Sequence, residues 1–254
     1  MYYLSVLSIF KNETMNLKIW LEHYLWQGVQ HFYLIDNGST DDPLNILQEY
    51  INKGIVSYFY LSEQHQQLKH YRYVFDKERL KEKTRWLAIC DLDEFFYGVN
   101  QNLINKIQSL DSYFDYVLCN WKVFGSNGNV EHPQDIRISI TQCKKDLCQE
   151  TKYIFKTKII NNSYQINVHK LTDLKINKYR IRIANKLIKL NHYQVQSLEY
   201  FTKVKMTRGD VIDQNIDNIR DMNYFFNCDY KEDNCEILKK NVLNYQYSNQ
   251  IEPY

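Results

Sequence analysis

The chain has few residues that interrupt regular structure, because its 254 residues include only seven glycines and three prolines. This composition gives no sign of a long flexible linker between domains. Hydrophobic residues make up 44% of the chain. That fraction excludes disordered and fibrous proteins, and a chain of this length can form one large α/β domain or two small ones.

An excess of charge of one sign is also absent, since 32 Lys and Arg residues balance 30 Asp and Glu residues for a net charge of +2. A dedicated nucleic-acid-binding protein carries a concentrated basic excess, so nucleic acid is not an expected partner. The six cysteines contain no C-x-x-C pair, and we expect them to be reduced thiols.

Long hydrophobic runs are missing as well. No segment approaches the roughly 18 to 20 consecutive apolar residues that span a bilayer. The opening MYYLSVLSIF has neither the basic start nor the small-residue cleavage site of a signal peptide. We therefore expect a cytoplasmic protein.

Strand-like and helix-like patterns alternate through the first part of the chain. Short β-prone or apolar runs predict strands, and apolar residues at i, i+3, i+4 spacing predict the helices between them. The expected strands cover 3–9, 31–35, 55–61 and 86–90, and the expected helices cover 17–25, 44–51 and 66–83. This alternation predicts an α/β fold with a mostly parallel central sheet flanked by helices.

Up to about residue 195 the sequence contains strand-like patterns, and after it the patterns are helical. Apolar residues there recur at helical spacing, as in Ile212, Ile216, Ile219, Met222 and Phe225. We therefore expect one domain over 1–195 and a C-terminal helical extension over 196–254 packed on it. The run Tyr224-Phe225-Phe226 is expected in the core or, alternatively, on a membrane surface as a peripheral contact.

Acidic residues follow two of the expected strands. The segment D-N-G-S-T-D-D begins at Asp36, and Asp91-Leu92-Asp93-Glu94 follows the strand over 86–90. Ligands of parallel α/β sheets bind beyond the carboxyl ends of the strands, so both clusters fall where a ligand is expected. Side chains alternate along an extended segment, which would let Asp91 and Asp93 share one Mg²⁺ or Mn²⁺ ion.

Two common phosphate-binding motifs are not found. The sequence has no G-x-G-x-x-G and no G-x-x-x-x-G-K-[ST], which disfavours a dinucleotide-binding Rossmann domain and a P-loop NTPase. A cation on the D-x-D motif would instead neutralise a diphosphate and the charge that grows when it leaves.

Several segments together resemble one enzyme group. They are Phe10-Lys11-Asn12-Glu13, Glu22-His23-Tyr24, Y-L-I-D-N-G-S-T-D over 33–41, D-L-D-E-F over 91–95, W-K-V-F-G-S-N-G over 121–128, and Asn191-His192-Tyr193 followed by Ser197, Glu199, Lys203, Arg208 and Gly209. In this order they look like the GT-A-fold glycosyltransferases of the family 2 and family 92 (DUF23-like) group. The resemblance covers about residues 3 to 210.

The resemblance implies transfer of a sugar from a UDP- or GDP-sugar to the hydroxyl of a glycan or lipid-linked glycan, with inversion of configuration. Residues 1–195 would be the GT-A nucleotide-sugar-binding and catalytic domain. Mn²⁺ or Mg²⁺ would be bound by Asp91, Asp93 and His192, with His169 as the alternative histidine. The donor-binding residues would be Asn12, Glu13, Asp36, Asn37, Asp91 and Arg208.

Two more donor contacts are suggested by position alone. Gln67 and Arg72 lie on the expected helix before the D-x-D motif, where they either approach the nucleotide or form a solvated helix face. Between Lys203 and Arg208 we favour Arg208 for the phosphates, because a guanidinium makes bidentate contacts. We expect Gly209 to end that helix.

Glu199 is the candidate catalytic base, because an inverting transferase needs a carboxylate on the acceptor side. A structural alternative exists for it. Ser197 is well placed to cap a helix that starts at Leu198, and an acidic residue in the first turn stabilises a helix through its dipole.

Two other classes of protein compete with a glycosyltransferase. A Mg²⁺-dependent nucleotidyltransferase also uses paired carboxylates. It would need basic residues near the first strand to bind the triphosphate, and Lys11 is the only basic residue there. A non-catalytic nucleotide- or glycan-binding module would not explain acidic residues at two strand ends.

Overall fold

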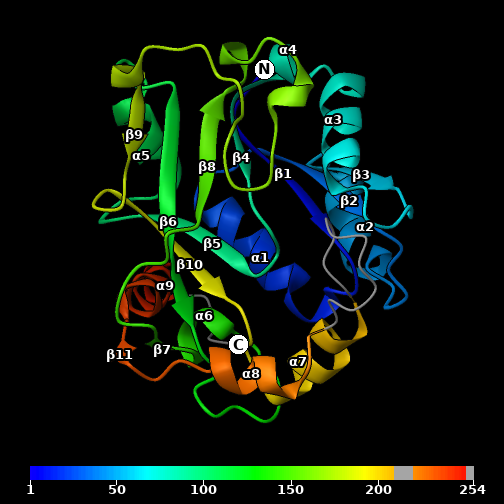
Figure 1. Ribbon diagram of the computed structural model, residues 1–254, viewed down its shortest axis with the longest axis vertical. Coiled ribbons are helices and arrows are strands. Elements are labelled where there is room, and N and C mark those ends of the chain that lie inside the picture. Colours follow the sequence, from blue (N-terminus) through cyan, green and yellow to red (C-terminus); the bar gives the residue numbers. More distant parts are fainter. Residues whose placement is uncertain (209–219, 250–254) are drawn as a thin grey trace. The chain divides into compact units, whose positions relative to one another are not determined.

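The computed structural model describes residues 1–208 and 220–249 (Figure 1). The described chain folds as two compact units. The first unit contains residues 1–121 and 149–190, and the second contains 122–148 and the described part of 191–254. This division reflects packing. The functional division at residue 195 stays a prediction.

Four parallel strands form the centre of the first unit. They are β1 (Tyr2–Phe10), β2 (His31–Asp36), β3 (Val56–Tyr60) and β4 (Thr84–Ile89). Their order in the sheet is β3-β2-β1-β4, and each neighbouring pair is parallel. The predicted strands are therefore confirmed, and so is the α/β class.

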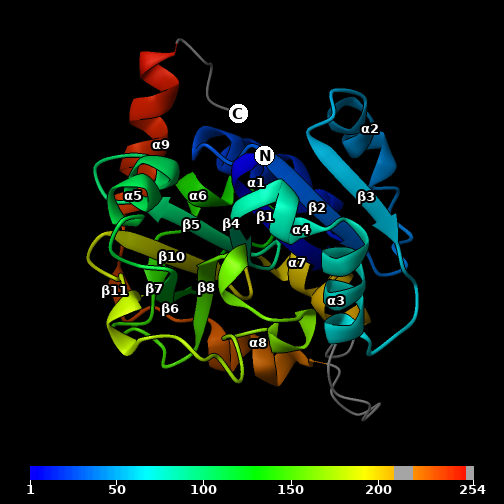
Figure 2. The same cartoon turned by 90° about the horizontal axis from the view of Figure 1, so that it is seen from above.

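Helices connect these strands. They are α1 (Thr14–Trp26), α2 (Leu44–Asn52), α3 (Gln67–Lys77) and α4 (Leu80–Lys83). The single helix expected over 66–83 is wrong, because Arg79 adopts a left-handed conformation with φ of 54° and separates α3 from α4. Figure 2 shows α2 and α3 on opposite sides of the parallel strands.

Asp41, which lies two residues before the N-cap of α2, bonds to another helix. An aspartate before a helix often caps it, but Pro43 occupies the N-cap position of α2 and no described side chain caps this helix. The Asp41 carboxylate instead accepts the backbone N–H of Thr14 at 2.9 Å, at the start of α1. It therefore joins the segment after β2 to the segment after β1.

Antiparallel strands extend the parallel sheet beyond β4. Strand β8 (Thr151–Lys156) pairs antiparallel with both β4 and β6 (Tyr116–Phe124), and β9 (Ile181–Ile183) pairs parallel with β6. The other elements of this unit are β5 (Glu94–Gly98), α5 (Leu103–Leu110), β10 (Ile188–Tyr193) and the 3₁₀ turns Thr157–Ile159, Ser163–Gln165 and Lys178–Arg180. Strands β6 and β10 continue into the second unit.

The second unit is mainly helical. Its elements are α6 (Ile136–Ser139), β7 (Gln142–Cys143), α7 (Leu198–Lys203), the 3₁₀ turn Lys205–Thr207, α8 (Met222–Cys228), β11 (Asp233–Asn234) and α9 (Ile237–Ser248). Val195, Phe201 and Phe225 form a buried cluster. The expected C-terminal helices are confirmed for the described residues, whereas Gly209, Ile212, Ile216 and Ile219 lie outside them.

The aromatic run of α8 divides between core and surface. Phe225 is buried against Phe201, with ring centroids 5.1 Å apart, whereas Phe226 is exposed. The core expectation is thus confirmed for Phe225. A peripheral membrane contact stays a prediction. Across residues 1–208 and 220–249, every helix is too short or too polar to cross a bilayer.

Candidate active site

The parallel sheet reverses its winding between β1 and β4. The chain proceeds from β1 outward to β2 and β3 and then returns to add β4 on the other side of β1. Loops at the carboxyl ends of such neighbouring strands separate and leave room for a ligand. Asn12 and Glu13 follow β1 there, and Asp91 follows β4.

The D-x-D motif forms a tight turn at this edge. The Glu94 N–H donates to the Asp91 carbonyl at 3.1 Å, so the segment is not extended and the expectation based on alternating side chains is wrong. Leu92 is buried, as predicted. The Asp91 side chain is 34% exposed, whereas Asp93 is almost fully buried.

Helix α1 supports the turn from within the protein. The indole Nε1–H of Trp20 is shared between the carbonyls of Asp91 and Glu94, at 3.0 and 3.1 Å. The Tyr24 hydroxyl donates to the Glu94 carbonyl at 3.0 Å and accepts the Phe96 N–H at the same distance. These buried bonds hold the backbone of the turn in one conformation.

A buried lysine neutralises part of the acidic turn. Lys152 of β8 has no exposed surface, and its Nζ lies 2.8 Å from Asp91 Oδ2 and 3.6 Å from Glu94 Oε2. Lys152 is not among the residues predicted from the sequence. A signal was available, because a lysine at position 152 directly precedes the apolar run Tyr153-Ile154-Phe155.

Burial and charge determine the protonation of this cluster. Burial raises the pKa of Glu94 well above its ordinary value, although Lys152 opposes the shift. Burial alone would lower the pKa of Lys152, but Asp91 and Glu94 outweigh it and raise that pKa well above its ordinary value. Lys152 is therefore a permanent cation beneath the turn.

The acidic turn offers hard oxygen donors of the kind that Mg²⁺ and Mn²⁺ prefer. Asp91 and Asp93 supply carboxylates, and no described group donates a hydrogen bond to the buried Glu94 Oε1. Within the described residues, however, no cluster of three or more His, Cys, Asp or Glu side chains could hold a metal. The carboxylates of the turn are chemically suited to a divalent cation, and its binding stays a prediction.

The loops after β1 and β2 are tied together by hydrogen bonds. Asn12 Oδ1 accepts the Thr40 N–H at 2.8 Å, and the Asn12 N–H donates to Ser39 Oγ at 2.9 Å. Asp36 accepts the Ser39 N–H at 2.7 Å and the Tyr58 hydroxyl at 2.7 Å. The structure thus brings Asn12 and Asp36 into one framework, and their contact with a nucleotide stays a prediction.

Two more predicted residues of these loops also have partners inside the protein. The Asn37 side-chain amide donates to the Leu61 and Glu63 carbonyls at 2.6 and 2.9 Å. Glu13 is buried and accepts the Asn16 side-chain amide at 3.1 Å. Both residues shape the carboxyl edge of the sheet, and their roles in binding a donor are untested.

The two candidates on α3 have different surroundings. Gln67 is buried and donates to the Tyr71 hydroxyl at 3.1 Å. Burial raises the pKa of Tyr71. The nearby charge of Asp91 raises this pKa further, and that of Lys152 lowers it. The Arg72 guanidinium instead lies over the Tyr164 ring at 4.8 Å. Gln67 therefore belongs to the surroundings of the acidic turn.

His169 lies in the same unit as the D-x-D motif. Burial lowers its pKa, and the nearby charges of Lys152 and Asp91 also act on it. Its ring packs edge-on against Trp121, with centroids 5.3 Å apart. The preferred histidine, His192, is a buried residue of β10 within the second unit. The ranking of the two as metal ligands stays a prediction.

Glu199 lies in the first turn of α7, in the second unit. The Ser197 hydroxyl accepts the Tyr200 N–H at 3.1 Å, so the predicted N-cap is confirmed. One Glu199 oxygen lies 2.7 Å from Lys203 Nζ, and the other accepts the His132 N–H at 2.8 Å. Both interactions lower the pKa of Glu199. The half-buried Arg208 follows the turn Lys205–Thr207.

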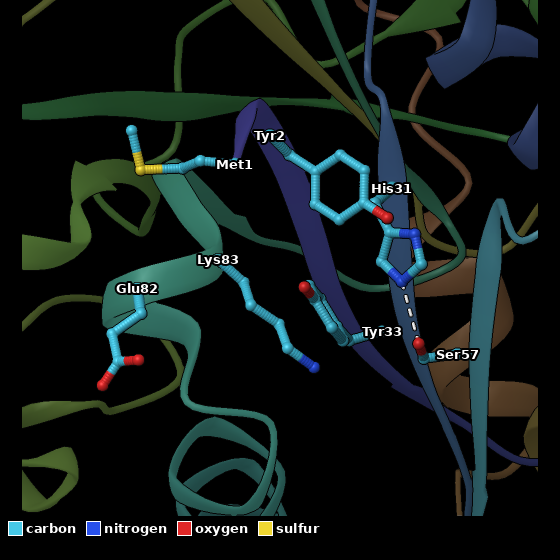
Figure 3. A pocket seen from close by; sticks show the side chains of 7 residues that line it. All are labelled: Met1, Tyr2, His31, Tyr33, Ser57, Glu82 and Lys83. Atoms are coloured by element: carbon cyan, nitrogen blue, oxygen red, sulfur yellow. Dashed lines mark hydrogen bonds between the residues drawn. The ribbon is translucent and has the colours of Figure 1, made fainter.

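A cavity of about 430 Å³ lies at the opposite edge of the parallel sheet (Figure 3). Its lining includes Tyr2 at the start of β1, His31 at the start of β2 and Ser57 near the start of β3. His31 stacks on Tyr2, donates from Nδ1 to the Gly54 carbonyl and accepts the Ser57 hydroxyl at Nε2. The cavity is therefore remote from the acidic turn.

Comparison with known proteins identifies relatives of this chain. A glycosyltransferase family 92 protein of Ricinus communis is 26% identical over 227 residues, which cover 82% of this chain and 37% of the relative. One of Arabidopsis thaliana is 24% identical over 221 residues, with coverage of 81% and 37%. The chain thus spans little more than a third of the length of these relatives.

Solved structures give a weaker similarity. The crystal structure of S. aureus TarS 1–349 in complex with UDP is 16% identical and has a TM-score of 0.45, covering 62% of this chain and 47% of that one. The family model of glycosyltransferase family 92, by contrast, matches residues 2–237. This confirms the resemblance found in the sequence: the chain belongs to glycosyltransferase family 92.

Proposed function

We propose that this chain is a metal-dependent glycosyltransferase that moves a sugar from a nucleotide-diphosphate sugar to a hydroxyl of a glycan or lipid-linked glycan. The observation that carries the proposal is the acidic turn at Asp91 and Asp93, which lies where the sheet reverses its winding. Membership of family 92 supports the same reaction.

In the proposed reaction the acceptor oxygen forms a bond to the anomeric carbon while the bond from that carbon to the diphosphate breaks. Asp93, with Asp91 and one histidine, would hold Mn²⁺ or Mg²⁺, which neutralises charge on the departing diphosphate. Glu199 would take the proton of the acceptor hydroxyl, and the configuration at the anomeric carbon would invert. Arg208 would contact the phosphates.

The donor would lie across the carboxyl edge of the parallel strands. Asn12, Asp36 and their hydrogen-bonded loops would form the nucleoside side of that site, and Gln67 would approach it from α3. The acidic turn cannot serve as the acceptor's base in this arrangement, because its carboxylates are committed to the cation and to Lys152.

A thermal-shift panel of nucleotide sugars with Mn²⁺, Mg²⁺ or EDTA tests the proposal, because a ligand that binds only the folded protein raises its apparent stability. We expect one nucleotide sugar to raise Tm with metal and to lose most of that effect in EDTA. Release of a nucleoside diphosphate on addition of an acceptor would complete the identification. Release of pyrophosphate from a nucleoside triphosphate would instead identify a nucleotidyltransferase.

A further inference from the structure

Gln196 is a buried polar side chain whose amide makes no hydrogen bond within the described residues. It follows β10, none of its surface is exposed, and both Oε1 and Nε2 lack a partner there. Another buried glutamine is well bonded, since Gln27 Oε1 accepts the N–H groups of Gly98 and Leu103 at 3.2 and 2.8 Å. An unpaired amide in the interior costs free energy, so Gln196 needs an explanation other than packing.

The backbone of Gln196 is unfavourable as well. Its φ is 56°, in the left-handed region that a residue with a Cβ rarely adopts. The fold fixes both of its neighbours, because Val195 is buried with Phe201 and Phe225, and Ser197 caps α7. Strain of this kind persists where the surroundings impose it, and it concentrates at functional sites.

Gln196 also lies close to the proposed catalytic base. Both residues belong to the second unit, and Glu199 follows Gln196 by three residues, so their Cα atoms are at most about 11 Å apart. The side chain of Glu199 is 30% exposed, so a ligand can reach this part of the unit. A substrate hydroxyl that approaches Glu199 therefore comes within reach of the Gln196 side chain.

The two ends of the Gln196 amide select the chemistry of a ligand. Oε1 accepts hydrogen bonds and Nε2 donates them. A phosphate offers only acceptors and would leave Oε1 unpaired, whereas a metal cation would leave Nε2 unpaired. Two neighbouring hydroxyls of a sugar offer a donor and an acceptor together, so they satisfy both ends of the amide.

We propose that Gln196 is a specificity-determining residue whose amide binds two neighbouring hydroxyls of a sugar beside Glu199. That sugar is the one transferred or the terminal sugar of the acceptor, and both offer the same hydroxyl chemistry. This inference rests on the proposed function and deepens it, because it names sugar hydroxyls as the partner of a residue that has no part in the proposed reaction steps.

Thermal unfolding without ligand tests whether the amide has a structural role. Gln196→Met keeps the length of the side chain and removes both polar atoms, so Tm should equal or exceed that of wild type, since no hydrogen bond is lost. Gln194→Met is the matched control. The Gln194 amide donates to the Tyr224 hydroxyl, so this variant should have a lower Tm. A Tm of Gln196→Met clearly below that of wild type overturns the inference.

Titration calorimetry in Mn²⁺ tests contact with the transferred sugar. The probes are UDP, UDP-glucose, UDP-galactose, GDP and GDP-mannose. If the amide binds this sugar, Gln196→Met should lose about tenfold or more in affinity for the nucleotide sugar that wild type binds, because two hydrogen bonds are lost. Its affinity for the corresponding nucleoside diphosphate should stay at the wild-type level, and Gln194→Met should bind both probes like wild type.

Turnover with that donor tests contact with the acceptor, and methyl glycosides of glucose, galactose and mannose are the acceptor probes. If the amide binds the acceptor sugar, Gln196→Met should raise KM for the acceptor about tenfold or more and leave donor affinity unchanged.

The outcomes separate this inference from the proposed function. Donor affinity of Gln196→Met that equals that of wild type, with no acceptor probe for which KM rises, overturns the inference about Gln196 and leaves the proposed function in place. If wild type binds none of the nucleotide sugars, the proposed function fails, and the inference fails with it.

Discussion

The backbone N–H of His132 donates to Glu199 at 2.8 Å, while Lys203 pairs with the other carboxylate oxygen of Glu199 at 2.7 Å. Glu199 thereby joins the segment before α6 to the first turn of α7. A carboxylate oxygen has two lone pairs, so each Glu199 oxygen can still accept a second hydrogen bond, for example from the hydroxyl of an acceptor. The pKa of Glu199 is lowered, which keeps it ionised at neutral pH.

We predict that Glu199→Gln keeps its affinity for the nucleotide sugar and loses about 10²-fold or more in turnover, the usual share of acid–base catalysis. Loss of turnover without loss of binding identifies an interaction made in the transition state. NMR of the first product should also show the anomeric configuration opposite to that of the donor.

Lys203→Met is the control, because it breaks the ion pair on α7 and leaves the carboxylate in place. Near-normal turnover of Glu199→Gln, or an equal loss in both variants together with a lower Tm, would leave Glu199 as a residue that only stabilises the start of α7.

A second prediction concerns Asp93. Asp93→Asn should abolish Mn²⁺-dependent binding of UDP, because it removes a carboxylate of the turn that would hold the cation in the proposed reaction. Isothermal titration of UDP with Mn²⁺ and with EDTA measures this. Asp42→Asn, an exposed change at the same edge of the sheet, is the matched control and should bind like wild type. Equal UDP affinity of wild type in Mn²⁺ and EDTA would refute the prediction.

The pattern of apolar residues was sufficient to predict β1 to β4 and most of their helices, because buried parallel strands are continuous apolar runs. It did not reveal the break at Arg79, where a left-handed residue that is neither Gly nor Asn separates α3 from α4. The helical spacing of apolar residues continues in the sequence before and after Arg79, so only the backbone conformation shows the break.

Lys152 illustrates why the site was only partly predictable. The lysine lies 61 residues after Asp91 in the chain, on a strand that pairs antiparallel with β4. Asp91 and Asp93 are predictable from the rule for strand ends, which needs local information alone. The buried counter-ion of Asp91 depends on the pairing of β8, and no local spacing specifies it.

A third prediction uses the acidic residue Asp115. Arg180 at 2.6 Å and Lys156 at 2.7 Å lower the pKa of Asp115 to about 2. Because the folded pKa lies below the unfolded value, this stabilisation is present above about pH 4 and is lost as pH falls toward 2.

Asp115→Asn should therefore reduce the free energy of unfolding at pH 7 by about 1 kcal/mol, after allowance for solvent screening. The difference from wild type should shrink as pH falls from 4 to 2 in urea-unfolding experiments. The exposed Asp146→Asn is the control and should show no such trend. A difference that stays constant with pH would exclude the ion pairs as its cause.

The last prediction concerns the support of the acidic turn by α1. Trp20 is fully buried and shares its indole N–H between the carbonyls of Asp91 and Glu94. Trp20→Phe removes that donor and leaves a small cavity, so the free energy of unfolding should fall by about 2 to 4 kcal/mol. Because the same carbonyls belong to the turn that carries Asp93, UDP affinity in Mn²⁺ should also fall in the folded variant.

Trp26→Phe, a half-buried change on the same helix, should affect stability less and leave UDP affinity unchanged. Urea unfolding and titration calorimetry measure the two effects. If Trp20→Phe loses stability but binds UDP as wild type does, the indole supports the core and has no part in shaping the turn.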